Sequence, residues 1–260
     1  MKESFVTFDG KFWDKEEILC KMVEDDFYYG YLGKNALSSS SVKKLLDSPK
    51  AYKNSLEKST KETPALIMGR LVHLAVLEPE KFFSLNIVDV SSRNTKLFKE
   101  ELSKEPNTFT HKEYISALSL SESIQANNEA SGRLDGLNTE VPAVGYINDL
   151  PFRAKADSIG KGRIVDLKTT NDIRKFRWSA KDLKYACQLY IYCKLFKVSY
   201  ESFEFLVIDK NTHDVGLFGV SGDFYSMGKN MVEQACEVYH HYFSYNKTLE
   251  LNQYIIKGTL

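Results

Sequence analysis

The stretch RAKADSIGKGRIVDLKTT, residues 153–170, decides the fold because it holds two apolar strands with charges near their ends. In its second half, Asp166 and Lys168 flank Leu167 at the end of an apolar run. Side chains two positions apart project from the same face of a strand, so the carboxylate and the ammonium are expected side by side. An isolated Asp-x-Lys at a strand end is most often a surface ion pair that stabilises little. Its meaning therefore depends on what surrounds it.

Apolar and polar residues alternate with a period of two on both sides of this stretch. The segments 139–147, 150–159 and 162–170 predict three consecutive strands. Asn148-Asp149 and Gly160-Lys161-Gly162 supply turn residues between them, so the three strands are expected to form an antiparallel meander.

Helical spacing dominates the chain before this meander and returns after it. Helices are expected near 38–48, from 50, at 64–77 and at 111–130, with a short apolar segment at 85–90. The polar, lysine-rich connection 91–108 is expected to be mobile in part. After the meander, the pattern predicts a helix at 179–196, strands at 202–210 and 215–221, and a last helix at 223–244.

These elements favour an α/β fold with a mixed central β-sheet flanked by helices and an N-terminal helical elaboration. We expect one domain over residues 1–260. Its parts are a leader at 1–34 (a short hairpin or irregular), a mainly helical part at 35–135, and a catalytic sheet core with C-terminal helices at 136–260.

Composition narrows the class of protein. With 43% hydrophobic residues in 260, the chain can bury a large core, and it has neither a run of eighteen apolar residues nor an apolar segment behind its first lysine. No membrane partner is expected, and the cytoplasm of a bacterial cell is the expected compartment. The four cysteines lack metal-binding spacing, which indicates reduced and mostly buried thiols.

Charge is distributed unevenly along a chain whose net formal charge is zero. Residues 153–184 carry ten basic side chains against four acidic ones, whereas residues 1–30 carry eight acidic side chains against four lysines. Zero net charge argues against nonspecific coating of nucleic acid, but the local basic excess lies around the Asp-x-Lys sequence.

A second carboxylate, Asp157, precedes Asp166 across a short turn, and the two are expected close together at one end of the sheet. Paired carboxylates repel each other unless a cation lies between them, and oxygen ligands suit Mg²⁺ or Mn²⁺. Lys168 could then orient a water or stabilise charge on a phosphate. These are the parts needed for metal-assisted hydrolysis of a phosphodiester.

The order of these residues resembles the PD-(D/E)XK nuclease superfamily, with its restriction-endonuclease-like core. Within it, the chain is most similar to the RecB-type and exonuclease VIII (RecE)-like phage exonucleases. The likeness includes YACQLYIY after the Asp-x-Lys strand, and LSSSSVKKLLDSPKAY and a G-x-x-x-H sequence (Gly69 to His73) before it. Ala156 stands where the superfamily name has proline. The resemblance implies that Lys168 is the catalytic lysine. It also implies that Gln188 and Tyr192 form a Q-x-x-x-Y element at the active site. The metal ligands that it implies are His73, Asp157, Asp166, the Leu167 carbonyl and, less securely, Glu140.

The resemblance also implies a function: an Mg²⁺-dependent (or Mn²⁺-dependent) exonuclease that digests linear duplex DNA from its ends, 5′ to 3′, for phage-type recombination. A single-strand annealing protein as partner and a ring-shaped homo-oligomer are further implications. Two alternatives remain open, namely an endonuclease or Cas4-like single-strand nuclease of the same fold, and a catalytically silent relative that binds DNA or a nuclease. Basic and aromatic residues after the Asp-x-Lys strand are candidates for DNA contact: Arg174, Lys175, Arg177, Trp178, Lys181 and Lys184.

Overall fold

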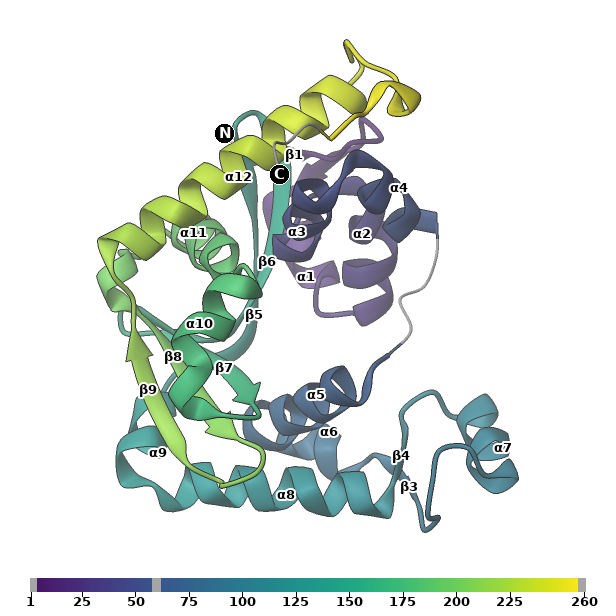
Figure 1. The fold of residues 1–260 in the computed structure, drawn as a ribbon, viewed down its shortest axis with the longest axis vertical. Coiled ribbons are helices and arrows are strands. Elements are labelled where there is room, and N and C mark those ends of the chain that lie inside the picture. The colour runs from purple at the N-terminus through teal and green to yellow at the C-terminus, as the bar shows by residue number, and fades with distance from the viewer. Residues whose placement is uncertain (1–3, 58–61, 257–260) are drawn as a thin grey trace.

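A five-stranded mixed sheet forms the centre of the protein (Figure 1), whose computed structural model describes residues 4–57 and 62–256. Neighbouring strands are antiparallel, except that β7 and β8 run parallel. The predicted mixed sheet and three-stranded meander are therefore confirmed. The strands follow their order in the chain across the sheet: β5 (Asn138–Ile147), β6 (Leu150–Gly160), β7 (Arg163–Thr170), β8 (Phe203–Asp209) and β9 (Val215–Gly219).

Helices cover both faces of this sheet. Side chains of β7 point to opposite faces and pack against the helices on each side. Ile164 belongs to one apolar core, whereas Val165 and Leu167 belong to the other. The Ile164 side carries α3 (Ser39–Asp47), α4 (Pro49–Glu57), α10 (Phe176–Asp182), α11 (Tyr185–Phe196) and α12 (Gly222–Tyr242). The other side carries α5 (Pro64–Leu77), α6 (Pro79–Phe83), α8 (His111–Ala126) and α9 (Asn128–Leu134).

Helices α11 and α12 pack with their backbones almost in contact. A Cβ atom at Gly228 of α12 would lie 2.0 Å from the carbonyl oxygen of Ala186 in α11, far inside contact distance. A glycine is therefore required at this crossing. The close approach fixes α11 between the sheet and the long C-terminal helix.

The leader is more ordered than its sequence indicates. Strands β1 (Ser4–Val6) and β2 (Phe12–Asp14) form the expected hairpin. The leader then adds helical segments that the composition did not predict, namely α1 (Lys15–Lys21), the π-helix η1 (Asp26–Tyr31) and α2 (Leu32–Asn35). Their apolar side chains enclose Trp13 in a small core that includes Val144 of β5, which attaches the leader to the sheet.

The elements differ from the expected ones at two further places. The connection 91–108 contains a helix, α7 (Lys96–Lys104), which Thr95 caps and which buries Phe98. It leads into β4 (Thr108–Thr110), which pairs with β3 (Asn86–Val88) in a two-stranded parallel sheet. The predicted helix at 179–196 is two helices, α10 and α11, because Lys184 has a φ of 54° and interrupts the helical backbone between them.

Short 3-10 turns complete the fold as described: η2 (Ile173–Lys175), η3 (Tyr200–Ser202) and η4 (Leu251–Gln253). The four cysteines are free, and three of them are buried as expected. A search of the described helices finds none that is long and apolar enough to cross a membrane.

Candidate active site

A cavity of about 1570 Å³ opens between the leader, α5 and the adjoining ends of β7 and α11. Its lining includes four of the residues singled out from the sequence: His73, Glu140, Lys168 and Gln188. Tyr29 of the π-helix lines it on the leader side. These four residues, of which His73 and Gln188 are more than a hundred positions apart in the chain, therefore share one groove.

His73, Glu140 and Asp157 form a cluster whose possible ligand atoms all lie within 4.8 Å of one another. The β5–β6 register pairs Thr139 with Ser158 and Val141 with Ala156, which places Glu140 opposite Asp157. Glu140 is itself unpaired in the ladder and has a φ of 52°, in the left-handed region that residues other than glycine seldom adopt. The strained backbone thus occurs at the residue that brings the second carboxylate to the cluster.

His73 presents a free ring nitrogen to this cluster. Its Nε2 lies 2.8 Å from the Leu167 carbonyl oxygen, which can only accept, so Nε2 carries the hydrogen. The other nitrogen, Nδ1, lies 3.6 Å from Oδ2 of Asp157. Burial and the nearby Lys168 ammonium lower the pKa of His73 to about 4, which keeps the ring neutral and the Nδ1 lone pair available.

Two carboxylates and an imidazole lone pair face one another here, and the cluster itself contains no positive charge to balance them. Burial, and then the Asp157 charge, raise the pKa of Glu140 to about 8. Burial also raises the pKa of Asp157. Oxygen-rich donor sets of this kind are those that Mg²⁺ and Mn²⁺ take in proteins. The residues present therefore fit the divalent ion that the sequence predicts.

Asp166 lies beside this cluster but has other partners. Lys168 donates to its Oδ2, and Nε2 of Gln188 donates to its Oδ1 at 2.6 Å. Burial raises the pKa of Asp166 to about 6 even though Lys168 opposes this shift. Asp166 and Lys168 thus lie on the same face of β7, as predicted, and Gln188 fixes the carboxylate from α11.

The remaining two predicted residues make main-chain contacts. Tyr192, one turn after Gln188 on α11, is buried and donates its hydroxyl to the Lys155 carbonyl at 2.7 Å. Its hydroxyl therefore ties α11 to β6. The Leu167 side chain is buried in the core, while its carbonyl accepts from His73.

Comparison with known proteins agrees with this geometry. The model of a PDDEXK-like domain family of unknown function (DUF3799) matches residues 38–248. The chain belongs to this PDDEXK-like family. The resemblance to the PD-(D/E)XK nucleases that the sequence indicates is thereby confirmed. No curated protein sequence matches the chain.

Two solved structures named as exonucleases are similar to this chain. A protein from Eubacterium rectale, provisionally named an exonuclease, superposes with a TM-score of 0.63 at 18% identity, over 84% of this chain and 85% of that one. A phage-related exonuclease from Haemophilus somnus 129PT superposes with a TM-score of 0.35 at 14% identity, over 78% of this chain and 93% of that one. The first of these likenesses supports the assignment of the fold.

The basic candidates for DNA contact lie outside the groove described above and do not line it. Arg174 and Lys175 are exposed and face Asp172 at 3.1 and 3.7 Å. Lys184 pairs with Asp47 of α3 at 2.8 Å. Arg177 and Lys181 line a separate hollow of about 510 Å³ between α10, β9 and α12, and Trp178 is 57% exposed.

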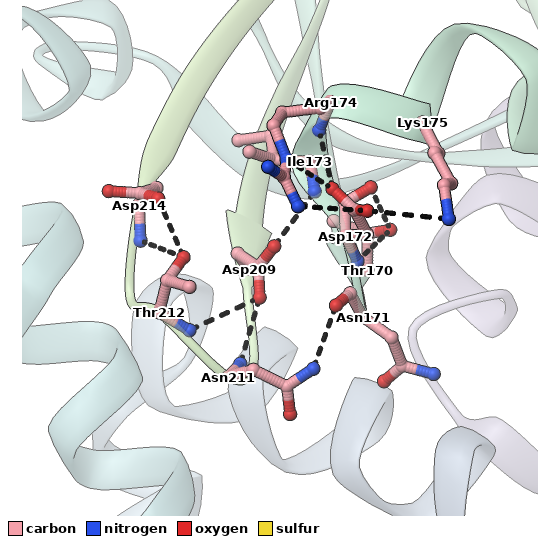
Figure 2. Close-up of polar contacts among 10 residues, drawn as sticks. All are labelled: Thr170, Asn171, Asp172, Ile173, Arg174, Lys175, Asp209, Asn211, Thr212 and Asp214. Atoms are coloured by element: carbon pink, nitrogen blue, oxygen red, sulfur yellow. Dashed lines mark hydrogen bonds and ion pairs between the residues drawn. The ribbon is translucent and has the colours of Figure 1, made fainter.

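Figure 2 shows how the loop after β7 is held in place. The carboxylate of Asp209 accepts the main-chain N–H groups of Ile173, Asn211 and Thr212. Burial alone would raise the pKa of Asp209, but these donors outweigh it and lower the pKa. Asn211 also donates to the Asn171 carbonyl at 2.7 Å. The network joins the β8–β9 turn to the end of the strand that carries Lys168.

Two groups at the site were not found by sequence reasoning. The leader contributes Asp25, Asp26 and Tyr29 to the groove wall, although its pattern indicated only a hairpin or irregular chain. Lys43 of α3 lies with its ammonium 4.9 Å from the centre of the Tyr185 ring, beside Lys168. Neither contact has a sequence signal, because each depends on how the N-terminal part packs against the sheet.

Proposed function

We propose that this protein is a metal-dependent nuclease that hydrolyses phosphodiester bonds of linear duplex DNA from its ends. The observation that carries the proposal is the Lys168 ammonium beside the Asp166 carboxylate, in the same groove as the His73–Glu140–Asp157 cluster. The volume of the groove exceeds the roughly 300–1,000 Å³ of an ordinary small-ligand pocket, which favours a polymeric substrate.

Each residue of the site has a part in this reaction. His73, Glu140 and Asp157 would hold the divalent ion, with Asp166 next to them. When bound, such an ion polarises the phosphate and lowers the pKa of a water. Lys168 stands where its positive charge meets the added negative charge on the phosphate during attack. Gln188 keeps the Asp166 carboxylate oriented through the 2.6 Å hydrogen bond.

The finer parts of the proposal come from the family resemblance. They are the use of Mg²⁺ or Mn²⁺, digestion from 5′ to 3′, and release of a single strand to an annealing protein during recombination. A closed ring of subunits would keep such an enzyme on its substrate. The duplex substrate also comes from the resemblance, and the size of the groove supports a polymeric substrate in general.

The decisive experiment is a time course on linear duplex DNA labelled separately at each end, in Mg²⁺ or Mn²⁺, with covalently closed circular DNA alongside. We expect loss of label from one end first and an intact circle. Lys168→Ala and Asp166→Ala should abolish digestion, whereas Lys96→Ala, at an exposed position on α7, should not.

Three outcomes would count against the proposal. Cleavage of the closed circle would identify an endonuclease instead. A folded protein that digests neither substrate with either ion, yet binds DNA, would be the silent relative. Undiminished digestion by the Lys168→Ala variant would remove the site from the reaction.

A further inference from the structure

Lys43 is a lysine held close to the proposed catalytic lysine by a rigid helix. On α3, its neighbours Val42 and Leu45 are fully buried, so the backbone that carries Lys43 is fixed against the core. Its ammonium lies 4.9 Å from the centre of the Tyr185 ring, and that of Lys168 lies 5.2 Å from the same centre. The two nitrogens are therefore no farther apart than these distances combined.

The Lys43 ammonium lacks an acidic partner. Among residues 4–57 and 62–256 it forms no ion pair and no hydrogen bond, and it lies over the Tyr185 ring. The nearest acid on α3, Asp47, is taken by Lys184, and Asp166 is taken by Lys168. A ring face attracts a cation, but less than a carboxylate does at close range.

The surroundings of Lys43 make this lack of a partner costly. Its side chain is half-buried, and Lys168 and Lys184 add like charges, while Asp166 and Cys187 partly oppose them. Burial, followed by Lys168, lowers the pKa of Lys43 to about 8. Since a buried unpaired charge destabilises the free protein, an anion at this place would relieve the excess.

We infer that Lys43 binds a phosphate of the DNA strand adjacent to the phosphate that Lys168 meets, so that the substrate supplies the missing negative charge. The inference rests on the proposed function and deepens it. Both ammonium groups lie against the ring of Tyr185, which lines the groove, and this shared contact keeps them within reach of neighbouring phosphates of one strand. Lys43 would thus be a substrate-binding residue, without contact to the reacting atoms.

The test uses the full chain and three substitutions. Lys43→Met keeps the apolar stem over Tyr185 and removes the charge, Lys43→Arg retains the charge, and Lys44→Met removes an exposed charge from the next position of the same helix. For each protein we would measure kcat and KM on linear duplex DNA in Mn²⁺ at several salt concentrations, together with the free energy of unfolding without metal.

For Lys43→Met we expect KM to rise about tenfold with a smaller change in kcat. The slope of log KM against log salt concentration should become shallower by about one unit, which corresponds to the loss of one phosphate contact. Stability without metal should equal or exceed that of the parent, because an unpaired charge is removed. The KM of the Lys43→Arg variant should be close to that of the parent protein. Equal KM and equal salt slopes in Lys43→Met and Lys44→Met would overturn the inference, as would lower stability with an unchanged slope.

A binding measurement separates this inference from the nuclease proposal. Fluorescence anisotropy of a labelled duplex gives the same salt slope without any cleavage. If the parent protein binds DNA but does not cut it, the nuclease proposal fails, while the slope still decides the role of Lys43. If the parent cuts DNA and its slope is unaffected by Lys43→Met, the role of Lys43 alone fails.

Discussion

Oδ2 of Asp157 accepts the main-chain N–H of Leu167 at 2.8 Å, so a side chain links β6 to β7 where their ladder has ended. The last paired residues before this point are Ser158 and Val165. The two strands therefore separate at the site, and one carboxylate both closes the gap and belongs to the His73–Glu140–Asp157 cluster. Fold and proposed function depend on the same atoms.

Two substitutions at Asp157 should separate these roles. Asp157→Asn keeps an oxygen that can accept the Leu167 N–H, whereas Asp157→Ala leaves that buried donor without a partner. Without metal, we expect Asn to be at least as stable as the parent and Ala to be less stable than Asn by about 1–3 kcal/mol. Urea unfolding with a chelator gives the difference, and equal stability of the two variants would contradict the bridging role. Both variants should lose Mn²⁺ binding in calorimetry.

Glu140→Gly should gain stability and lose metal binding. A non-glycine residue in the left-handed region costs about 1–3 kcal/mol, which glycine avoids at the φ of 52° found here. Loss of the carboxylate should weaken Mn²⁺ binding by about tenfold or more. Lys197→Gly is the matched control, because Lys197 has a φ of 56° at the end of α11, outside the cluster. It should stabilise the protein with Mn²⁺ affinity unchanged; a similar loss of affinity in both variants would refute the assignment of Glu140.

The stability that Lys43 contributes should depend on pH above neutrality. Burial and the neighbouring Lys168 hold its pKa near 8, below the ordinary 10.5, against the opposing charges of Asp166 and Cys187. Between pH 8 and 10 the unfolded chain therefore binds more protons at this residue, so its contribution to stability rises with pH. The free energy of unfolding of the parent relative to Lys43→Met should increase across this range by up to about 3 kcal/mol. Denaturation at several pH values measures it, with Lys44→Met as control; a constant difference would contradict the prediction.

Gly228→Ala should disturb the site from a distance. The added Cβ would meet the Ala186 carbonyl in α11, which cannot move aside as a flexible side chain would. We expect destabilisation of about 1–3 kcal/mol and reduced digestion, because α11 carries Gln188. Gly132→Ala on α9, where a Cβ meets nothing within 4 Å, should keep both stability and activity. Thermal unfolding and the digestion assay distinguish the two variants, and matching behaviour would argue against tight α11–α12 packing.

The sheet was predictable because its signals are local. Period-two alternation and turn residues at Asn148-Asp149 and Gly160-Lys161-Gly162 define strands β5 to β7 closely. The shared face of Asp166 and Lys168 follows from strand geometry alone. His73 entered only through the family resemblance, since a histidine within an apolar helix has no sequence signal of its own.

What could not be predicted depends on tertiary contacts or on single backbone angles. The break between α10 and α11 comes from one left-handed residue, Lys184, in a segment whose apolar spacing continues across it. That Asp157 and Asp166 share a cation remains a prediction, whereas the sequence did not indicate that Asp157 clusters with Glu140 and His73 while Asp166 faces Lys168 and Gln188. Glu140 takes part in this arrangement with an unusual φ, and the sequence does not predict that φ because glutamate has no preference for the left-handed region.

The leader has a consequence for how this family can diversify. The match to the family model begins at residue 38 of this chain, yet Asp25, Asp26 and Tyr29 form part of the groove wall. This part of the wall therefore lies outside the matched residues. We expect relatives to differ in this wall, and with it in the shape of the entrance, without any change in the sheet or in the His73–Glu140–Asp157 cluster.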